Sequence, residues 1–173
     1  MKKILFLSLV LLLTLTASAH RNDAAGFFAA APLDVAPYNF VKYLNDHHIS
    51  LNETSLYYEG TLNGQKAYMR YSYEDKKVSQ FLVFISNDGM TRKKATSVYN
   101  DIFYSLIGDQ RFVARGGSHP MTRKTIIPEN GTYKAQFRQK GLPEGEQKFI
   151  DIEVSESRDL YFIKIRCHST VAQ

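Results

Sequence analysis

The sequence predicts an α+β fold in which a meandering antiparallel sheet of six to seven strands has two helices packed against it. Two observations predict this class. Several segments alternate apolar and polar residues with a period of two, and two other segments carry apolar residues at helical spacing. The predicted order is a helix, three strands, a second helix and three to four strands. This order hints at a repeated unit, although the two parts share no visible sequence similarity.

Residues 1–19 have the three parts of a secretory signal peptide. Two lysines directly follow Met1, residues 4–15 are a nearly unbroken apolar run, and small residues precede the expected cleavage point. The run is shorter than the roughly 20 apolar residues that cross a bilayer. We therefore expect a soluble mature chain that begins at His20, is secreted or periplasmic, and does not span a membrane.

The composition is that of an ordinary globular domain, with 44% hydrophobic and 23% charged residues. Lysine and arginine exceed aspartate and glutamate by 22 to 17, but two of the lysines lie in the predicted signal peptide. Such a mild positive excess argues against nucleic acid as a partner, because phosphate contacts supply much of that affinity. Cys167 is the only cysteine, so no disulfide can form within the chain.

Residues 20–36 are rich in alanine and lack a sustained period, which predicts a flexible N-terminal tail. Phe27 and Phe28 could dock this tail on the domain. Residues 37–173 are expected to form a single α+β domain. It opens with a helix over residues 37–48, because a proline suits the first helical turn; Asp34 is a possible N-cap just upstream.

A β-hairpin is predicted next, with strands over residues 56–62 and 65–73. Asn63-Gly64 between them suits a type I′ turn, which requires positive φ at both central residues. That turn places residues whose numbers add to 127 opposite each other. One side is apolar and includes Leu56, Tyr58, Ala67, Met69 and Tyr71; the other is amphipathic and includes Tyr57, Glu59, Lys66, Tyr68 and Arg70.

The third strand, residues 78–86, is apolar on both sides, which predicts a central strand that is covered twice. Asn87-Asp88-Gly89 should break it. Residues 91–107 then carry apolar side chains at helical spacing, and Gly108 is expected to close this helix as its C′ residue.

The rest of the chain predicts strands over residues 111–115, 132–139, 148–154 and 160–168. The last two should form a hairpin that buries the isoleucines. Its alternation leaves Asp151 and Glu153 outside, beside Lys164 and Arg166. We interpret these four residues as a solvated ion ladder rather than as an acid and base pair.

No catalytic motif, phosphate-binding glycine loop or metal-ligand spacing is visible, so the sequence predicts no cofactor and no metal. Cys167 and His168 are neighbours on a strand and must point to opposite faces, which excludes them as a nucleophile and base pair. Cys167 is therefore expected to be a buried thiol.

Two groups of candidate ligand-binding residues remain. The first lies in or beside the connection 116–128, whose length of about 13 residues is typical of functional or disordered loops, and consists of Arg115, His119, Arg123 and Lys124. It could contact an anion or an acidic partner, or be a flexible basic loop. The second group, on the amphipathic side of the hairpin, consists of Tyr57, Tyr68 and Arg70. It could bind a saccharide or peptide, or be an ordinary sheet face.

We expect an exported, soluble, non-catalytic binding or interaction domain whose partner is a protein, peptide or glycan outside the cytoplasm. The alternatives are an extracytoplasmic hydrolase whose site assembles from sequence-distant residues, and a structural component of the envelope. A deep pocket in which His119 or His168 meets carboxylates would favour the enzyme. A shallow aromatic or basic surface would favour binding.

Overall fold

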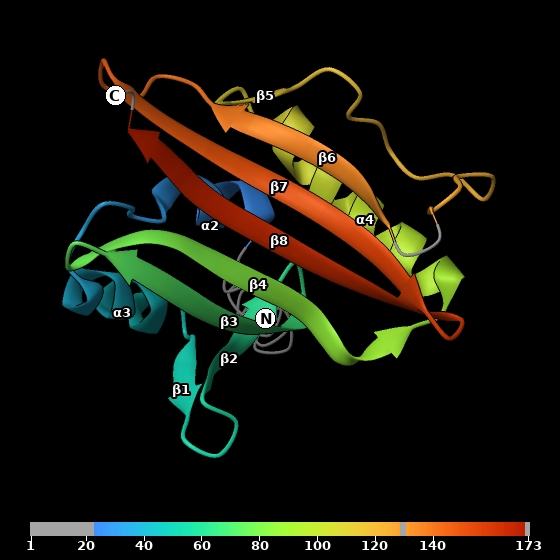
Figure 1. Ribbon diagram of the computed structural model, residues 1–173, viewed down its shortest axis with the longest axis horizontal. Helices are drawn as coiled ribbons and strands as arrows, with labels where there is room; N and C mark the ends of the chain where they lie inside the picture. The colour runs from blue at the N-terminus through green and yellow to red at the C-terminus, as the bar shows by residue number, and fades with distance from the viewer. Residues whose placement is uncertain (1–22, 129–130, 172–173) are drawn as a thin grey trace, which may run out of the picture.

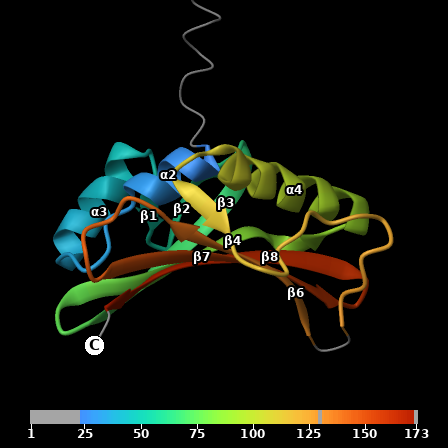
Figure 2. The same cartoon turned by 90° about the horizontal axis from the view of Figure 1, so that it is seen from above.

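The computed structural model describes residues 23–128 and 131–171. Within these ranges, eight strands form one antiparallel sheet in the order β1-β2-β3-β4-β8-β7-β6-β5 (Figure 1). Three helices all lie on one side of it (Figure 2). The predicted α+β class is confirmed, with one more helix and at least one more strand than expected. The predicted signal peptide lies outside the described residues.

Each half of the domain consists of one helix followed by four strands. The same order of elements therefore occurs twice, as the sequence suggested. The first half contains α3 (Pro37–Asp46), β1 (Ser50–Asn52), β2 (Tyr57–Leu62), β3 (Gln65–Glu74) and β4 (Lys77–Met90). The second half contains α4 (Arg92–Gly108), β5 (Phe112–Ala114), β6 (Thr132–Gln139), β7 (Glu146–Ser157) and β8 (Leu160–Val171). The fourth strands of the two halves, β4 and β8, pair at the centre of the sheet.

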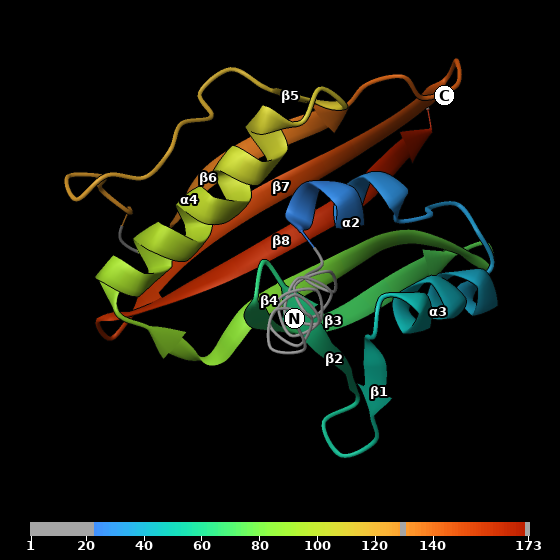
Figure 3. The same ribbon diagram turned by 180° about the vertical axis from the view of Figure 1, so that it is seen from behind.

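The predicted flexible tail is wrong where the structure describes it, because its residues form α2 (Ala24–Ala30), which lies between α3 and α4 (Figure 3). The Asp23 side chain caps this helix by accepting a hydrogen bond from the Gly26 amide. Phe27 and Phe28 are buried, and both contact Phe81 of β4. The two phenylalanines thus supply the apolar area that fixes the segment.

Lys148 of β7 is buried beneath α2. Its ammonium group donates a 2.6 Å hydrogen bond to the carbonyl oxygen of Ala31, at the end of α2 where carbonyl groups lack helical partners. A cation at a helix C-terminus is also favoured by the helix dipole. Burial lowers the pKa of Lys148, so these carbonyl contacts help to keep a charged group inside the domain.

The β2–β3 hairpin has the predicted register, with Tyr58 opposite Met69 and Glu59 opposite Tyr68. Asn63 and Gly64 both have positive φ, as a type I′ turn requires. The expectation for Leu56 was wrong. This residue precedes the strand, has a φ of 60° and is 75% exposed, so it adds nothing to the apolar side.

β4 is central, as predicted, but helices cover only one of its faces within the described residues. Phe81, Val83 and Ile85 are buried under the helices, whereas Leu82 and Phe84 on the other side stay half-exposed. Strict alternation from Leu82 and Phe84 would also place Val78 on this other side. It is buried instead, because the register of β3 and β4 shifts near their shared turn.

Three other boundaries differ from the prediction. Residues 87–89 do not end β4; they bulge, and the strand continues to Met90. Gly108 is the last residue of α4 rather than its C′ residue, although the helix begins at the predicted place with Thr91 as N-cap. Asp34 does not cap α3, whose N-cap is Ala36.

The C-terminal hairpin is longer than expected on both strands, and Arg158 and Asp159, both with positive φ, form its turn. Ile150, Ile152 and Val154 of β7 are buried under the helices together with Cys167 of β8. Burial raises the pKa of the Cys167 thiol to about 12, so the residue is the inert buried thiol that the alternation predicted. Among the described residues, no helix combines the length and the apolar character needed to cross a membrane.

Candidate functional site

The side of the sheet that carries no described helix is the candidate functional site, and we call it the open face. Figure 1 looks onto this side. Side chains reach it from every second position of each strand. Its residues include Tyr57, Glu59, Lys66, Tyr68, Arg70, Leu82, Phe84, Arg115, Lys134, Gln136, Arg138, Phe149, Asp151, Glu153, Phe162, Lys164, Arg166 and His168.

The first half of the open face is an aromatic cluster. The Tyr57 ring makes edge contacts with the rings of Tyr68 and Phe84, at centroid distances of 6.5 and 6.2 Å. The Arg70 guanidinium lies over Phe84 at 5.5 Å, and the Lys66 ammonium lies over Tyr68 at 4.8 Å. The structure therefore brings together Tyr57, Tyr68 and Arg70, the second group of candidate residues.

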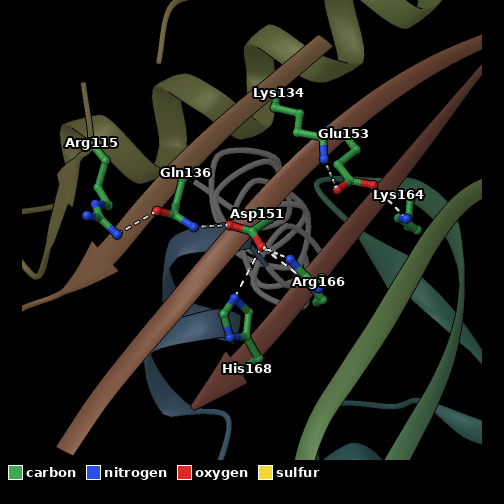
Figure 4. Close-up of polar contacts among 8 residues, drawn as sticks. All are labelled: Arg115, Lys134, Gln136, Asp151, Glu153, Lys164, Arg166 and His168. Carbon is green, nitrogen blue, oxygen red and sulfur yellow. Dashed lines mark hydrogen bonds and ion pairs between the residues drawn. The ribbon is translucent and has the colours of Figure 1, made fainter. Parts of the chain in front are cut away.

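The second half of the open face contains an ionic network centred on Asp151 of β7 (Figure 4). Arg166 donates two hydrogen bonds to Asp151 Oδ2, at 3.1 and 2.6 Å, and His168 Nε2 lies 3.1 Å from the same oxygen. The Gln136 amide donates to Oδ1 at 2.7 Å and in turn accepts from Arg115 at 3.0 Å. These contacts link five side chains, from three strands and the segment after β5, in one network.

Glu153, two residues further along β7, has a cation on each side. Lys134 of β6 lies 3.2 Å from one carboxylate oxygen and Lys164 of β8 lies 2.6 Å from the other. The strand register causes this arrangement, because Lys134, Glu153 and Lys164 are direct cross-strand neighbours.

The predicted pairing of these charges is confirmed, but the ladder is not solvated as expected. Asp151 and Glu153 are only 5% and 7% exposed. Burial by itself raises their pKa values, but hydrogen bonds outweigh it: those from His168, Gln136 and Arg166 lower the pKa of Asp151 well below its usual range. Those from Lys164 and Lys134 lower the pKa of Glu153. Both carboxylates are therefore charged at neutral pH.

At the centre of the open face, apolar side chains lie between the tyrosines of the aromatic cluster and the network. Leu82 and Phe84 come from β4 and Phe162 comes from β8, and all three are half-exposed. Phe84 and Phe162 line a hollow of about 270 Å³, whose wall also includes Glu153 and Lys164. Its volume is below the range typical of pockets that enclose a small ligand.

The first group of candidate residues does not stay together. Arg115 belongs to the open face, where its guanidinium lies over Phe149 at 5.6 Å. Arg123 instead lines a separate hollow with Arg92, Lys93 and Thr96 at the start of α4, on the helix side of the molecule. His119 and Lys124 have exposed side chains in the same connection.

The connection 116–128 is tied to the domain by its backbone. The Tyr99 and Tyr133 hydroxyls donate to the His119 carbonyl at 3.1 and 3.0 Å. The Asn100 side chain both donates to and accepts from the backbone of Met121, whose own side chain is buried. This loop is thus anchored along α4.

A deep pocket in which His119 or His168 meets carboxylates would favour an enzyme, and the structure meets this criterion only in part. His168 does meet a carboxylate, Asp151, but the pair is held with Arg166 on the open face, and the nearby hollow is small. Cys167 points to the opposite, helix-covered side. No group of three or more His, Cys, Asp or Glu side chains suited to a metal ion occurs among residues 23–128 and 131–171.

Sequence reasoning missed Leu82, Phe84, Phe162, Gln136 and the position of His168 in the network. The signal for the apolar residues was present, since Leu82 and Phe84 make β4 apolar on its second side. That pattern was interpreted as double coverage. Gln136 and His168 could have been found by extending the cross-strand register from Asp151 in both directions.

No protein-family model, curated protein or solved structure matches the chain significantly.

Proposed function

We propose that the protein is an exported, soluble, non-catalytic binding domain whose contact surface is the open face. The observation that carries this proposal is the contrast between the two sides of β4. On one side Phe81, Val83 and Ile85 are fully covered by helices, whereas Leu82 and Phe84 on the other side remain half-exposed. Neighbouring apolar side chains that stay partly exposed at the centre of a sheet are typical of interaction surfaces.

The residues around this centre support the same function. Tyrosine and arginine are the residue types that dominate binding energy in protein interfaces, and Tyr57, Tyr68 and Arg70 lie beside Phe84. In the second half, the ionic network fixes the positions of Arg115 and Arg166 through Gln136 and Asp151. Side chains that are held before binding lose less conformational entropy when a partner arrives.

The first experiment is a pull-down from the extracytoplasmic fraction together with a glycan array. The wild-type chain is compared with the double variant Tyr57→Ser/Tyr68→Ser. The control is Tyr38→Ser/Tyr104→Ser, which removes two exposed tyrosines from α3 and α4 on the helix side. We expect the wild type and the control to retain one and the same partner and the open-face variant to lose it. Recovery of nothing above background, or equal recovery by all three proteins, would contradict the proposal.

Export is tested separately by mass spectrometry of the secreted or periplasmic protein. The signal-peptide pattern predicts a chain that begins at His20. An intact chain that starts at Met1 and stays in the membrane fraction would contradict this part of the proposal.

A further inference from the structure

In the ionic network of the open face, the carboxylates are buried close to the sheet and the cations are exposed to solvent. The side chain of Glu153 is 9% exposed, whereas those of Lys134 and Lys164, which flank it, are 61% and 42% exposed. The side chain of Asp151 is 7% exposed beneath an Arg166 side chain that is 43% exposed. An approaching partner therefore meets the positive groups first.

Three arginines add to this positive surface. Arg70, Arg115 and Arg138 are exposed, and within the described part of the chain none of them forms an ion pair with a carboxylate. Arg70 and Arg115 lie over the rings of Phe84 and Phe149, which holds their guanidinium groups near the sheet. The cations of the open face outnumber its carboxylates even though the whole chain is only mildly basic.

The cations flank an apolar centre rather than forming a separate patch. Cross-strand pairing places Leu82 directly between Arg70 and Arg166. In the next row it places Phe84 between Tyr68 and Lys164. An apolar and aromatic core surrounded by charged groups is the anatomy of a protein–protein contact.

The size of the open face also fits a protein partner. Strands lie about 4.8 Å apart and side chains on one face repeat every 7 Å or so, so the six strands longer than three residues, with three to four rows of side chains, cover roughly 600–800 Å². A standard interface buries about 800 Å² on each partner. The hollow beside Phe84 is too small to enclose a ligand by itself, but it can accept one side chain of a partner.

We propose that the open face binds an acidic protein surface that carries an exposed aromatic or aliphatic side chain at its centre. This inference rests on the proposed function and names its partner class. A second copy of the chain fits poorly, because a symmetric contact would oppose like charges. An anionic polysaccharide would satisfy the cations, but it would leave Leu82 and Phe162 without apolar contacts.

The test uses three defined probes: poly-L-glutamate, a glutamate–tyrosine copolymer of similar length, and dextran sulfate of similar charge. Binding is measured at low and at raised salt, since exposed charges are screened within about 8 Å at physiological ionic strength. We expect the copolymer to bind at least about tenfold more tightly than poly-L-glutamate, because only the copolymer supplies aromatic contacts to Phe84 and Phe162. Both affinities should fall as salt increases.

Variants assign this binding to the open face. Arg70→Glu should weaken copolymer binding by about tenfold or more. Lys42→Glu on α3 changes the net charge equally, but it lies on the helix side and should change binding by less than about twofold. Leu82→Ala should weaken binding of the copolymer and leave binding of poly-L-glutamate unchanged. Thermal melts of each variant confirm that it is folded.

Three outcomes would overturn the inference. Equal loss with Arg70→Glu and Lys42→Glu would mean that binding is a non-specific charge effect. Tight binding of dextran sulfate that is unchanged in the Leu82→Ala variant would indicate that the partner is an anionic polysaccharide. Binding of no probe, combined with a pull-down that depends on Tyr57 and Tyr68, would leave the proposed function standing and remove the acidic partner.

Discussion

The half of the open face built by β2, β3 and β4 exposes aromatic rings, whereas the half built by β6, β7 and β8 exposes the cationic ends of a buried ionic network. Both halves have the same layout of one helix followed by four strands, and both bury an aliphatic layer under their helices. The two halves are therefore alike in the layer that the helices cover. They differ in the side chains that point to the open face.

The largest effect is expected where the halves are alike. Met69 and Ile152 are buried in the covered layer of the first and second half, and an aspartate at either position would be an unpaired charge in an apolar site. We expect Met69→Asp and Ile152→Asp each to lower the free energy of unfolding by at least about 4 kcal/mol. Denaturant melts measure this loss. A small loss of stability in only one of the two variants would contradict the similarity of the two buried layers.

A smaller effect should separate the two halves on the open face. Asp151→Ala leaves Arg166, His168 and Gln136 without their shared acceptor. We expect a loss of about 2–3 kcal/mol, below the range for a fully buried pair because Arg166 can be rehydrated. Glu59→Ala in the first half removes a more exposed carboxylate that pairs with a solvent-exposed lysine. It should leave the denaturation midpoint within experimental error, and an equal loss in both variants would contradict the comparison.

The network should also make stability depend on pH. The pKa values of Asp151 and Glu153 are lower in the folded chain than in the unfolded chain. Their contribution is therefore present above the ordinary carboxyl range near pH 4, and it is lost as the pH falls through the lower folded-state values. Denaturant midpoints measured from pH 6 to acid should fall more steeply for the wild type than for Asp151→Ala. Parallel curves would show that Asp151 makes no such contribution.

A small effect is also expected at Tyr68, in the aromatic half. Tyr68→Ser removes a half-exposed ring that contacts Tyr57 and Lys66, so the free energy of unfolding should stay within about 1 kcal/mol of the wild type. If this variant were as unstable as Met69→Asp, the open face would be packed against another part of the chain. Tyr57, Tyr68 and Arg70 would then be lost as binding residues.

The strands, the long helix and the hairpin register could be predicted because local rules determine them. Asn63-Gly64 sets the register of β2 and β3, and alternation assigns Ile150 and Asp151 to opposite faces. The α2 helix could not be predicted. Its short alanine-rich sequence has weak periodicity, and it is held by tertiary contacts of Phe27 and Phe28.

The candidate site was predicted only in pieces for a similar reason. The grouping of Tyr57, Tyr68 and Arg70 follows from one hairpin, so it could be predicted. The network of Arg115, Gln136 and Asp151 depends on which strands become neighbours in an eight-stranded sheet. That order could not be predicted from the sequence. The same order decides which side of β4 the helices leave uncovered.

Site-specific photocrosslinking can show directly whether the open face is the contact surface. A photoreactive phenylalanine analogue is placed at Tyr68 in the first half, at Arg138 in the second half, or at Tyr104 on the helix side, which is 56% exposed. Each protein is irradiated in its extracytoplasmic fraction. We expect the same covalent adduct from Tyr68 and Arg138 and no adduct from Tyr104. An adduct from Tyr104 with none from the two open-face positions would contradict this expectation.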